Sequence, residues 1–268
     1  MHNQFILSPF FLEKPLPVAE RLASPEWIIN KPQLPESGQM ACMSIVHRHL
    51  ADIVANTVKS GYRPVSIAGD CCATIGVLAG LQRAGVMPRL VWLDAHGDFN
   101  TWETTPSGFI GGMPLAMIVG RGDQALLQAA SLAPLAERDV ILVDARDLDP
   151  GERELLQQSA VLHVTKVAAL HQLVSATQPL YIHLDVDVLD FAEAPAMKYP
   201  VRGGPELGTL CAILERLANS APVVGVSMTL WDLEQDADGR TAHASMALLQ
   251  AAIGEAEHDN NIGNGKPG

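Results

Sequence analysis

The chain has 268 residues, a formal net charge of −12 at pH 7 and four cysteines. This acidic balance argues against nucleic acid or an anionic membrane as a partner, because both require basic patches. No apolar stretch is long enough to span a bilayer, no basic-then-apolar signal pattern opens the chain, and the cysteines form no disulfide framework, so we expect a cytoplasmic protein.

Strand-like and helix-like segments alternate along most of the chain. Short apolar runs typical of buried strands lie at residues 64–68, 89–93, 140–143, 161–164, 180–184 and 223–228. Helical patterns lie at residues 72–83, 124–136, 205–218 and 240–253. This alternation predicts a three-layer α/β/α fold around a central, mostly parallel sheet. We expect residues 1–257 to form a single domain, followed by a polar, disordered tail at 258–268.

Metal-ligand side chains follow two of the predicted strands. Three of them, spaced two apart, follow one strand, and two more follow a later one: Asp94, His96, Asp98, Asp185 and Asp187. In an extended backbone alternate side chains point to the same side, and the carboxyl ends of parallel strands form the ligand crevice. Because buried carboxylates without a cation are costly, the two runs together predict one shared cation site. Two separate aspartate-rich surface turns are the alternative.

Three short motifs occur in order: Ala-Gly-Asp-Cys-Cys at residues 68–72, Asp-Ala-His-Gly-Asp at 94–98 and Asp-Val-Asp-Val-Leu-Asp at 185–190. They resemble Gly-Gly-Asp-His-Ser, Asp-Ala-His-x-Asp and Asp-x-Asp-x-x-Asp of the arginase (ureohydrolase) family, and their order and spacing hold over most of the chain. That family hydrolyses guanidino groups at a dimanganese centre. The resemblance therefore implies an arginase-like α/β fold and a metal-dependent amidinohydrolase that uses Mn²⁺.

The resemblance also implies roles for single residues. Asp94 and Asp185 resemble the carboxylates that bridge two metals, and His96 and Asp187 would complete the second metal site. Asp98 would bind the first metal and act as the catalytic residue that hydrogen-bonds the nucleophile. The residue types suit this chemistry, because Mn²⁺ prefers carboxylate oxygens and tolerates an imidazole, and bound cations lower the pKa of a water molecule.

Four further residues match arginase positions that hold the amino-acid end of the substrate. Asn100 and Ser107 correspond to the residues that bind the α-carboxylate, and Asp149 and Glu152 to those that receive the α-amino group, directly or through water. The resemblance therefore implies a small guanidino amino acid as substrate, rather than a decarboxylated guanidine such as agmatine. Ordinary loop capping is the alternative for Asn100 and Ser107.

Three positions depart from the arginase pattern. Cys71 replaces the first-metal histidine, and because a soft thiol suits Mn²⁺ poorly, the sequence is compatible with one or two Mn²⁺ per chain. Gly111 occupies the position of the proton-shuttle histidine, and Leu230 occupies that of the glutamate that pairs with the guanidinium. These changes resemble the Nω-hydroxy-L-arginine amidinohydrolases, which release hydroxyurea and L-ornithine. An N-hydroxyguanidine is less basic than a guanidine and depends less on both missing groups.

Alternatives stay open at this point. They are an arginase or another ureohydrolase, a metal-dependent hydrolase of an N-formimidoyl amino acid, and a non-catalytic relative that binds a guanidino ligand. The sequence does not define the oligomeric state, and a homo-oligomer is compatible with it. His183, two residues before Asp185, would be either a packed core histidine or a residue that orients a metal ligand.

Overall fold

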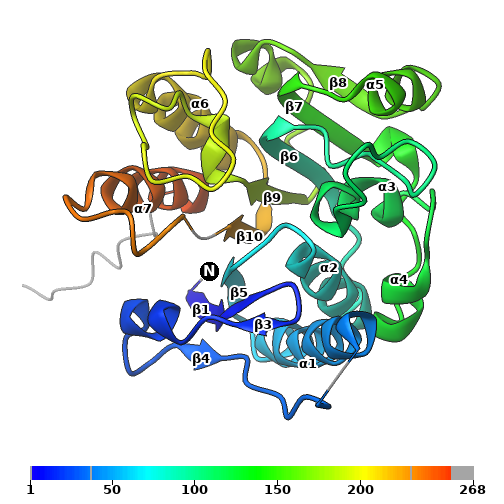
Figure 1. Ribbon diagram of the computed structural model, residues 1–268. Coiled ribbons are helices and arrows are strands. Elements are labelled where there is room, and N and C mark those ends of the chain that lie inside the picture. Colours follow the sequence, from blue (N-terminus) through cyan, green and yellow to red (C-terminus); the bar gives the residue numbers. More distant parts are fainter. Residues whose placement is uncertain (1, 37, 230, 255–268) are drawn as a thin grey trace, which may run out of the picture.

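Figure 1 shows the computed structural model of the chain, which describes residues 2–36, 38–229 and 231–254. Its centre is a parallel sheet of eight strands. From one edge to the other these are β4 (Ile28–Ile29), β1 (Asn3–Ser8), β5 (Arg63–Ala68), β10 (Val223–Thr229), β9 (Leu180–Leu184), β6 (Arg89–His96), β7 (Val140–Asp147) and β8 (Leu162–Val164). A small antiparallel pair, β2 (Phe10–Phe11) and β3 (Lys14–Pro15), lies beside the sheet.

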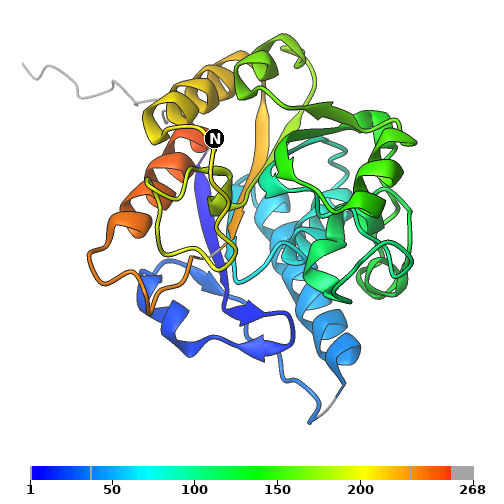
Figure 2. The ribbon, with the colours of Figure 1, turned by 45° about the horizontal axis from the view of Figure 1, so that its top comes forward.

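Helices cover both faces of this sheet, which confirms the predicted three-layer fold and shows that its central sheet is wholly parallel. One face carries α1 (Gln39–Lys59), α2 (Ala73–Arg83), α3 (Pro114–Ile118), α4 (Ala125–Ala130) and α5 (Pro150–Gln157). The other face carries α6 (Leu207–Ser220) and α7 (Arg240–Ile253). Figures 1 and 2 show the two groups of helices on opposite sides of the strands.

Burial on both faces explains why the strands read as continuous apolar runs. In β6, Leu90 and Trp92 pack into the core under α1 and α2, whereas Val91 and Leu93 pack into the core under α6 and α7. Successive side chains of a strand point to opposite faces, so a strand covered on both sides needs apolar residues at every position. Short 3-10 turns complete the chain: η1 (Pro17–Leu22), η2 (Ile110–Gly112), η3 (Glu137–Asp139), η4 (Val167–Gln172) and η5 (Val186–Val188).

The structure corrects the predicted elements at two places. The helix predicted at 124–136 is wrong beyond α4, which ends at Ala130, because Ser131 adopts a left-handed conformation with φ 55°. The sequence analysis also placed no element before residue 64, where the structure has β1, β4 and the long helix α1. The predicted tail at 258–268 lies outside the described residues. Among the described helices, none combines the length and the apolar composition that crossing a membrane requires.

Candidate metal centre and substrate cavity

A cavity of about 470 Å³ lies at the carboxyl ends of β5, β9 and β6. This is the place at which open parallel sheets bind their ligands. The structure brings every predicted site residue to its wall: Cys71, Asp94, His96, Asp98, Asn100, Ser107, Asp149, Glu152, Asp185 and Asp187. Residues separated by more than one hundred positions in the sequence therefore share one pocket.

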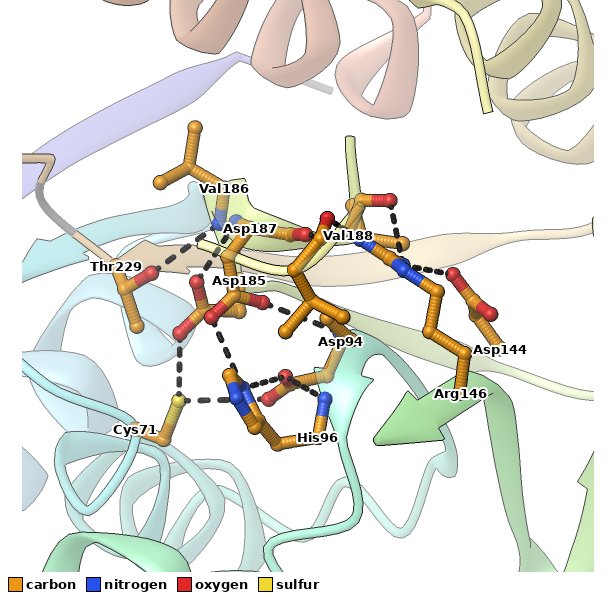
Figure 3. A network of polar contacts seen from close by, with 12 residues as sticks. Cys71, Asp94, His96, Asp144, Arg146, Asp185, Val186, Asp187, Val188 and Thr229 are labelled. Atoms are coloured by element: carbon orange, nitrogen blue, oxygen red, sulfur yellow. Dashed lines mark hydrogen bonds and ion pairs between the residues drawn. The ribbon is translucent and has the colours of Figure 1, made fainter. Parts of the chain in front are cut away.

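Two overlapping groups of ligand-type atoms lie at the floor of the cavity (Figure 3). One group is Cys71, Asp94 and Asp185, and the other is Asp94, His96 and Asp187; within each group the ligand atoms lie within 4.8 Å of one another. His96 Nδ1 lies 3.0 Å from Asp187 Oδ2, and Cys71 Sγ lies 3.1 Å from Asp185 Oδ2. Asp94 belongs to both groups, as expected of a bridging carboxylate, whereas Asp185, which was also expected to bridge, belongs only to the first group.

Local hydrogen bonds fix the two aspartate runs against each other. Asp185 caps η5, and its Oδ1 accepts a hydrogen bond from the Asp187 amide at 3.0 Å. Asp187 Oδ1 in turn accepts a hydrogen bond from the Ala95 amide at 3.1 Å, which ties η5 to the end of β6. Asp94 Oδ2 accepts a hydrogen bond from Trp92 Nε1 at 3.1 Å. The carboxylates are therefore oriented by the protein itself.

The arrangement of Asp98 corrects one detail of the sequence analysis, which assumed an extended backbone from Asp94 to Asp98. Strand β6 ends at His96, and Asp98 has a left-handed φ of 49°. At Gly97 a Cβ atom would lie 2.6 Å from Glu152 Oε1 and 2.4 Å from a Leu148 methyl carbon, so any larger residue would push these two side chains aside. The turn still directs Asp98 into the cavity, although Asp98 lies outside both ligand groups.

The ionisable side chains of this cluster have shifted pKa values. Burial raises the pKa of Asp185 and of Asp187 to about 6, and burial with the neighbouring Asp94 raises the pKa of Asp98 well above its usual range. Burial lowers the pKa of His96, but hydrogen bonds to Asp187 and Asp94 outweigh it and raise this pKa to about 12. The carboxylates thus need a positive charge among them, which a bound cation would supply.

These residues fit a divalent cation. Asp98 Oδ2 is buried and has no hydrogen-bond partner, which is costly for a carboxylate oxygen. Carboxylates and one imidazole, gathered in two overlapping groups, are the donors that a hard cation such as Mn²⁺ prefers. The residues that would hold it are Asp94, His96, Asp185 and Asp187, and Asp98 would face a cation at the first site, beside Cys71.

Arg146 is a site residue that the sequence analysis missed. Its guanidinium pairs with Asp144 and donates hydrogen bonds to the carbonyl oxygens of Asp187 at 2.9 Å and Val201 at 2.8 Å, as well as to those of Val188, Leu189 and Arg202. Figure 3 shows Arg146 extending from β7 to the turn that carries Asp187. An arginine between two aspartates, at the end of a strand that begins as an apolar run, is the signal that could have drawn attention to it.

Three of the predicted substrate residues form a connected group in the cavity wall, whereas Ser107 lies apart from them in an exposed loop. Asn100 Nδ2 donates a hydrogen bond to Asp149 Oδ2 at 2.9 Å. Asp149 is the N-cap of α5, and Glu152 completes a capping box with it. The Glu152 oxygens accept hydrogen bonds from the amides of Phe99 at 2.8 Å and Asp149 at 3.1 Å, and burial raises the Glu152 pKa to about 7. Glu152 therefore builds this wall, and its contact with an α-amino group stays a prediction.

His183 is a packed core histidine. Its Nδ1 lies 3.0 Å from Thr74 Oγ1 and 2.8 Å from Ser227 Oγ, and its ring lies against Trp92. Burial lowers its pKa to about 3, so the ring is neutral. It does not line the cavity.

Known proteins match this chain over most of its length. A sequence model of the arginase family matches residues 29–254. Arginase of Bacillus caldovelox is 32% identical over 219 residues, which cover 77% of this chain and 73% of that protein. The chain belongs to the arginase family. It is thus related to ureohydrolases, which are hydrolases that act on amidino or guanidino groups.

Two further arginase-family proteins are similar over nearly the whole chain. The N(omega)-hydroxy-L-arginine amidinohydrolase of Streptomyces lavendulae is 28% identical over 259 residues, which cover 96% of this chain and 87% of that protein. The crystal structure of arginase from Bacillus cereus superimposes with a TM-score of 0.81 and 26% identity, over 96% of this chain and 100% of that one. The resemblance that the three motifs indicated is confirmed, and so is the fold.

The structure shows the surroundings of two of the three residues that depart from the arginase motifs. Cys71 is buried, and its Sγ donates hydrogen bonds to Asp185 Oδ2 at 3.1 Å and Asp94 Oδ2 at 3.8 Å. At Gly111 a Cβ atom would lie 2.3 Å from the Phe109 ring, so a side chain there would have to displace the ring. The third departure, Leu230, lies outside the described residues.

Proposed function

We propose that this chain is a manganese-dependent amidinohydrolase that hydrolyses Nω-hydroxy-L-arginine to hydroxyurea and L-ornithine. The observation that carries the proposal is the Cys71 thiol, which donates a hydrogen bond to Asp185 where the arginase motif has a metal-binding histidine. Burial and the charges of Asp98, Asp185 and Asp94 raise the Cys71 pKa well above its usual value, so this group is a neutral thiol. A first metal site with such a ligand is weaker than that of an arginase.

The floor of the cavity would hold and activate the reacting group. When bound, Mn²⁺ lowers the pKa of a water molecule and polarises the group under attack. Asp94, His96, Asp185 and Asp187 would hold the cation. Asp98 is the proposed catalytic residue, because its Oδ2 has no other partner and can accept a proton from the attacking water.

The opposite wall would hold the amino-acid end of the substrate. Asp149 and Asn100 are already hydrogen-bonded to each other, and Asp149 is fixed as a helix cap, so both side chains are positioned before a ligand arrives. Asp149 can receive an α-amino group, whereas Asn100 and Ser107 can bind an α-carboxylate. Agmatine lacks the carboxylate and would leave the last two without a partner.

The departures favour a weakly basic reacting group. A protonated guanidinium gains from a carboxylate partner and from a strong proton donor, and the sequence offers Leu230 and Gly111 at those positions. An N-hydroxyguanidine binds nearly neutral and carries an electron-withdrawing oxygen. The similarity of this protein, over 96% of its chain, to an N(omega)-hydroxy-L-arginine amidinohydrolase supports the same conclusion.

A competition assay tests the proposal. Manganese-loaded enzyme is given equal concentrations of Nω-hydroxy-L-arginine and L-arginine, and hydroxyurea and urea are measured in the same tube. We expect kcat/KM for the hydroxylated substrate to be higher by at least about tenfold, the value of one charge-assisted hydrogen bond. Asp98→Asn should be inactive, and the exposed control Asp238→Asn should match the wild type. A preference for L-arginine would refute the proposal and leave an unusual arginase.

A further inference from the structure

A lysine side chain lies in the wall of the acidic cavity. Among the described residues that line it, Lys198 is the only lysine or arginine, whereas most of the other charged groups there are carboxylates. The Lys198 side chain is exposed, but its Nζ lies 3.6 Å from the centroid of the Phe11 ring. A cation over an aromatic face is favourable and keeps the ammonium at the cavity wall.

The position of Lys198 relates it to the reacting end of the substrate. The Ala196 carbonyl accepts a hydrogen bond from the Asp232 amide at 2.8 Å, so the Lys198 loop runs beside the segment that follows β10. In the arginase motif this segment carries the glutamate that pairs with the guanidinium. Partial burial lowers the Lys198 pKa, and the charges of Asp70, Asp232 and Asp185 oppose that shift. The ammonium therefore lies within electrostatic range of Asp70 and Asp185, two carboxylates that line the cavity.

An aromatic lip holds the same loop in place. We use this name for Phe11, Phe109 and Tyr199, whose rings follow one another with centroids 6.3 Å and 5.7 Å apart. Tyr199 also lies edge-on to His96, with centroids 6.5 Å apart. The residue next to Lys198 thus contacts the metal-ligand group, and the loop is part of the cavity wall.

We propose that Lys198 is a specificity-determining residue, whose ammonium disfavours a cationic group at the reacting end of the substrate and donates a hydrogen bond to a neutral group that carries an oxygen there. Like charges in a confined cavity repel each other, whereas an ammonium and an oxygen acceptor form a charge-assisted hydrogen bond. The application of this preference to an N-hydroxyguanidine rests on the proposed function.

Binding of two non-hydrolysed amino acids tests the charge preference directly. L-lysine ends in a full cation, and L-citrulline is a neutral isostere of arginine with an oxygen at the reacting end. Their Kd values are measured by calorimetry on manganese-loaded wild type, Lys198→Met, Lys198→Arg and Lys166→Met, a lysine that does not line the cavity. We expect Lys198→Met to shift the Kd ratio toward L-lysine by roughly tenfold. Lys198→Arg and Lys166→Met should leave the ratio near that of the wild type.

Two results would overturn the inference. An unchanged ratio in Lys198→Met would mean that the ammonium does not sense the ligand. An equal loss of affinity for both amino acids would mean that Lys198 binds their shared amino-acid end. The same variants are then compared for kcat/KM on Nω-hydroxy-L-arginine and L-arginine, where Lys198→Met should lower the ratio. Should the wild type fail to hydrolyse the hydroxylated substrate, the proposed function fails, while the Kd ratio still decides the role of Lys198.

Discussion

Replacing Arg146 with methionine should loosen the turn that carries Asp187. The methionine keeps much of the aliphatic length but removes every hydrogen bond to the carbonyls on η5 and on the loop at 201–202. It also leaves the Asp144 carboxylate without its partner; the two side chains are 14% and 11% exposed. Removing one member of a mostly buried ion pair costs about 3–5 kcal/mol, so we expect a loss of that size in the free energy of unfolding.

The measurement is urea unfolding of chelated protein, followed by Mn²⁺ titration of the folded protein. Because Arg146 orients the backbone beside a metal ligand, Mn²⁺ affinity should fall by roughly tenfold to a hundredfold. Arg240→Met is the matched control, since Arg240 forms an exposed pair with Asp238 at 3.6 Å and such pairs contribute about 0–1 kcal/mol. Equal stability and equal Mn²⁺ affinity in the two variants would refute the role assigned to Arg146.

Four further predictions concern the metal, the substrate and pH. Asp185→Ala should abolish activity and lower the bound Mn²⁺ measured by metal analysis, and full activity in thoroughly chelated wild type would contradict a metal mechanism. Cys71→His should raise the Mn²⁺ content toward two per chain and increase turnover of L-arginine. If the wild type already holds two Mn²⁺ tightly and the variant does not differ from it, this account of Cys71 is wrong. Asp149→Asn keeps the helix cap but loses the charge, so KM for α-amino substrates should rise by about tenfold, and an unchanged KM would remove Asp149 from the binding site. Burial lowers the pKa of His47 to about 4, so between pH 6.5 and pH 4 the unfolded state binds a proton that the folded state does not. Stability should therefore fall by about 2 kcal/mol from pH 7 to pH 5 through this group, and His47→Gln should show a correspondingly smaller change in urea unfolding.

The sequence predicted those parts of the molecule that a local pattern encodes. Six of the eight strands of the sheet could be predicted, because most of them are apolar runs buried on both faces, whereas β1 and β4 were missed. The ligand groups could be predicted because ionisable residues follow two of these strands. The left-handed turn at Asp98 was not predicted, since it depends on the tight packing of Gly97 against Leu148 and Glu152. Arg146 was missed for a related reason: its carbonyl partners lie about forty to fifty-five residues further along the chain.

Contacts between side chains that no local pattern records also escaped prediction. The sequence shows that Gly111 replaces a histidine of the arginase pattern, but only the structure shows the Phe109 ring in the vacated space. The cation–π contact between Lys198 and Phe11 joins two segments that are far apart in the chain. In both cases the sequence shows the residues, but only the fold shows that their side chains are in contact.

The contact between Gly111 and Phe109 also couples position 111 to the wall of the cavity. A histidine introduced at 111 would bring its Cβ to 2.3 Å from the Phe109 ring, so that the ring would have to turn away. The ring packs against Tyr199, and this movement would remove packing from the aromatic lip. A change at position 111 would therefore also alter the loop that carries Lys198.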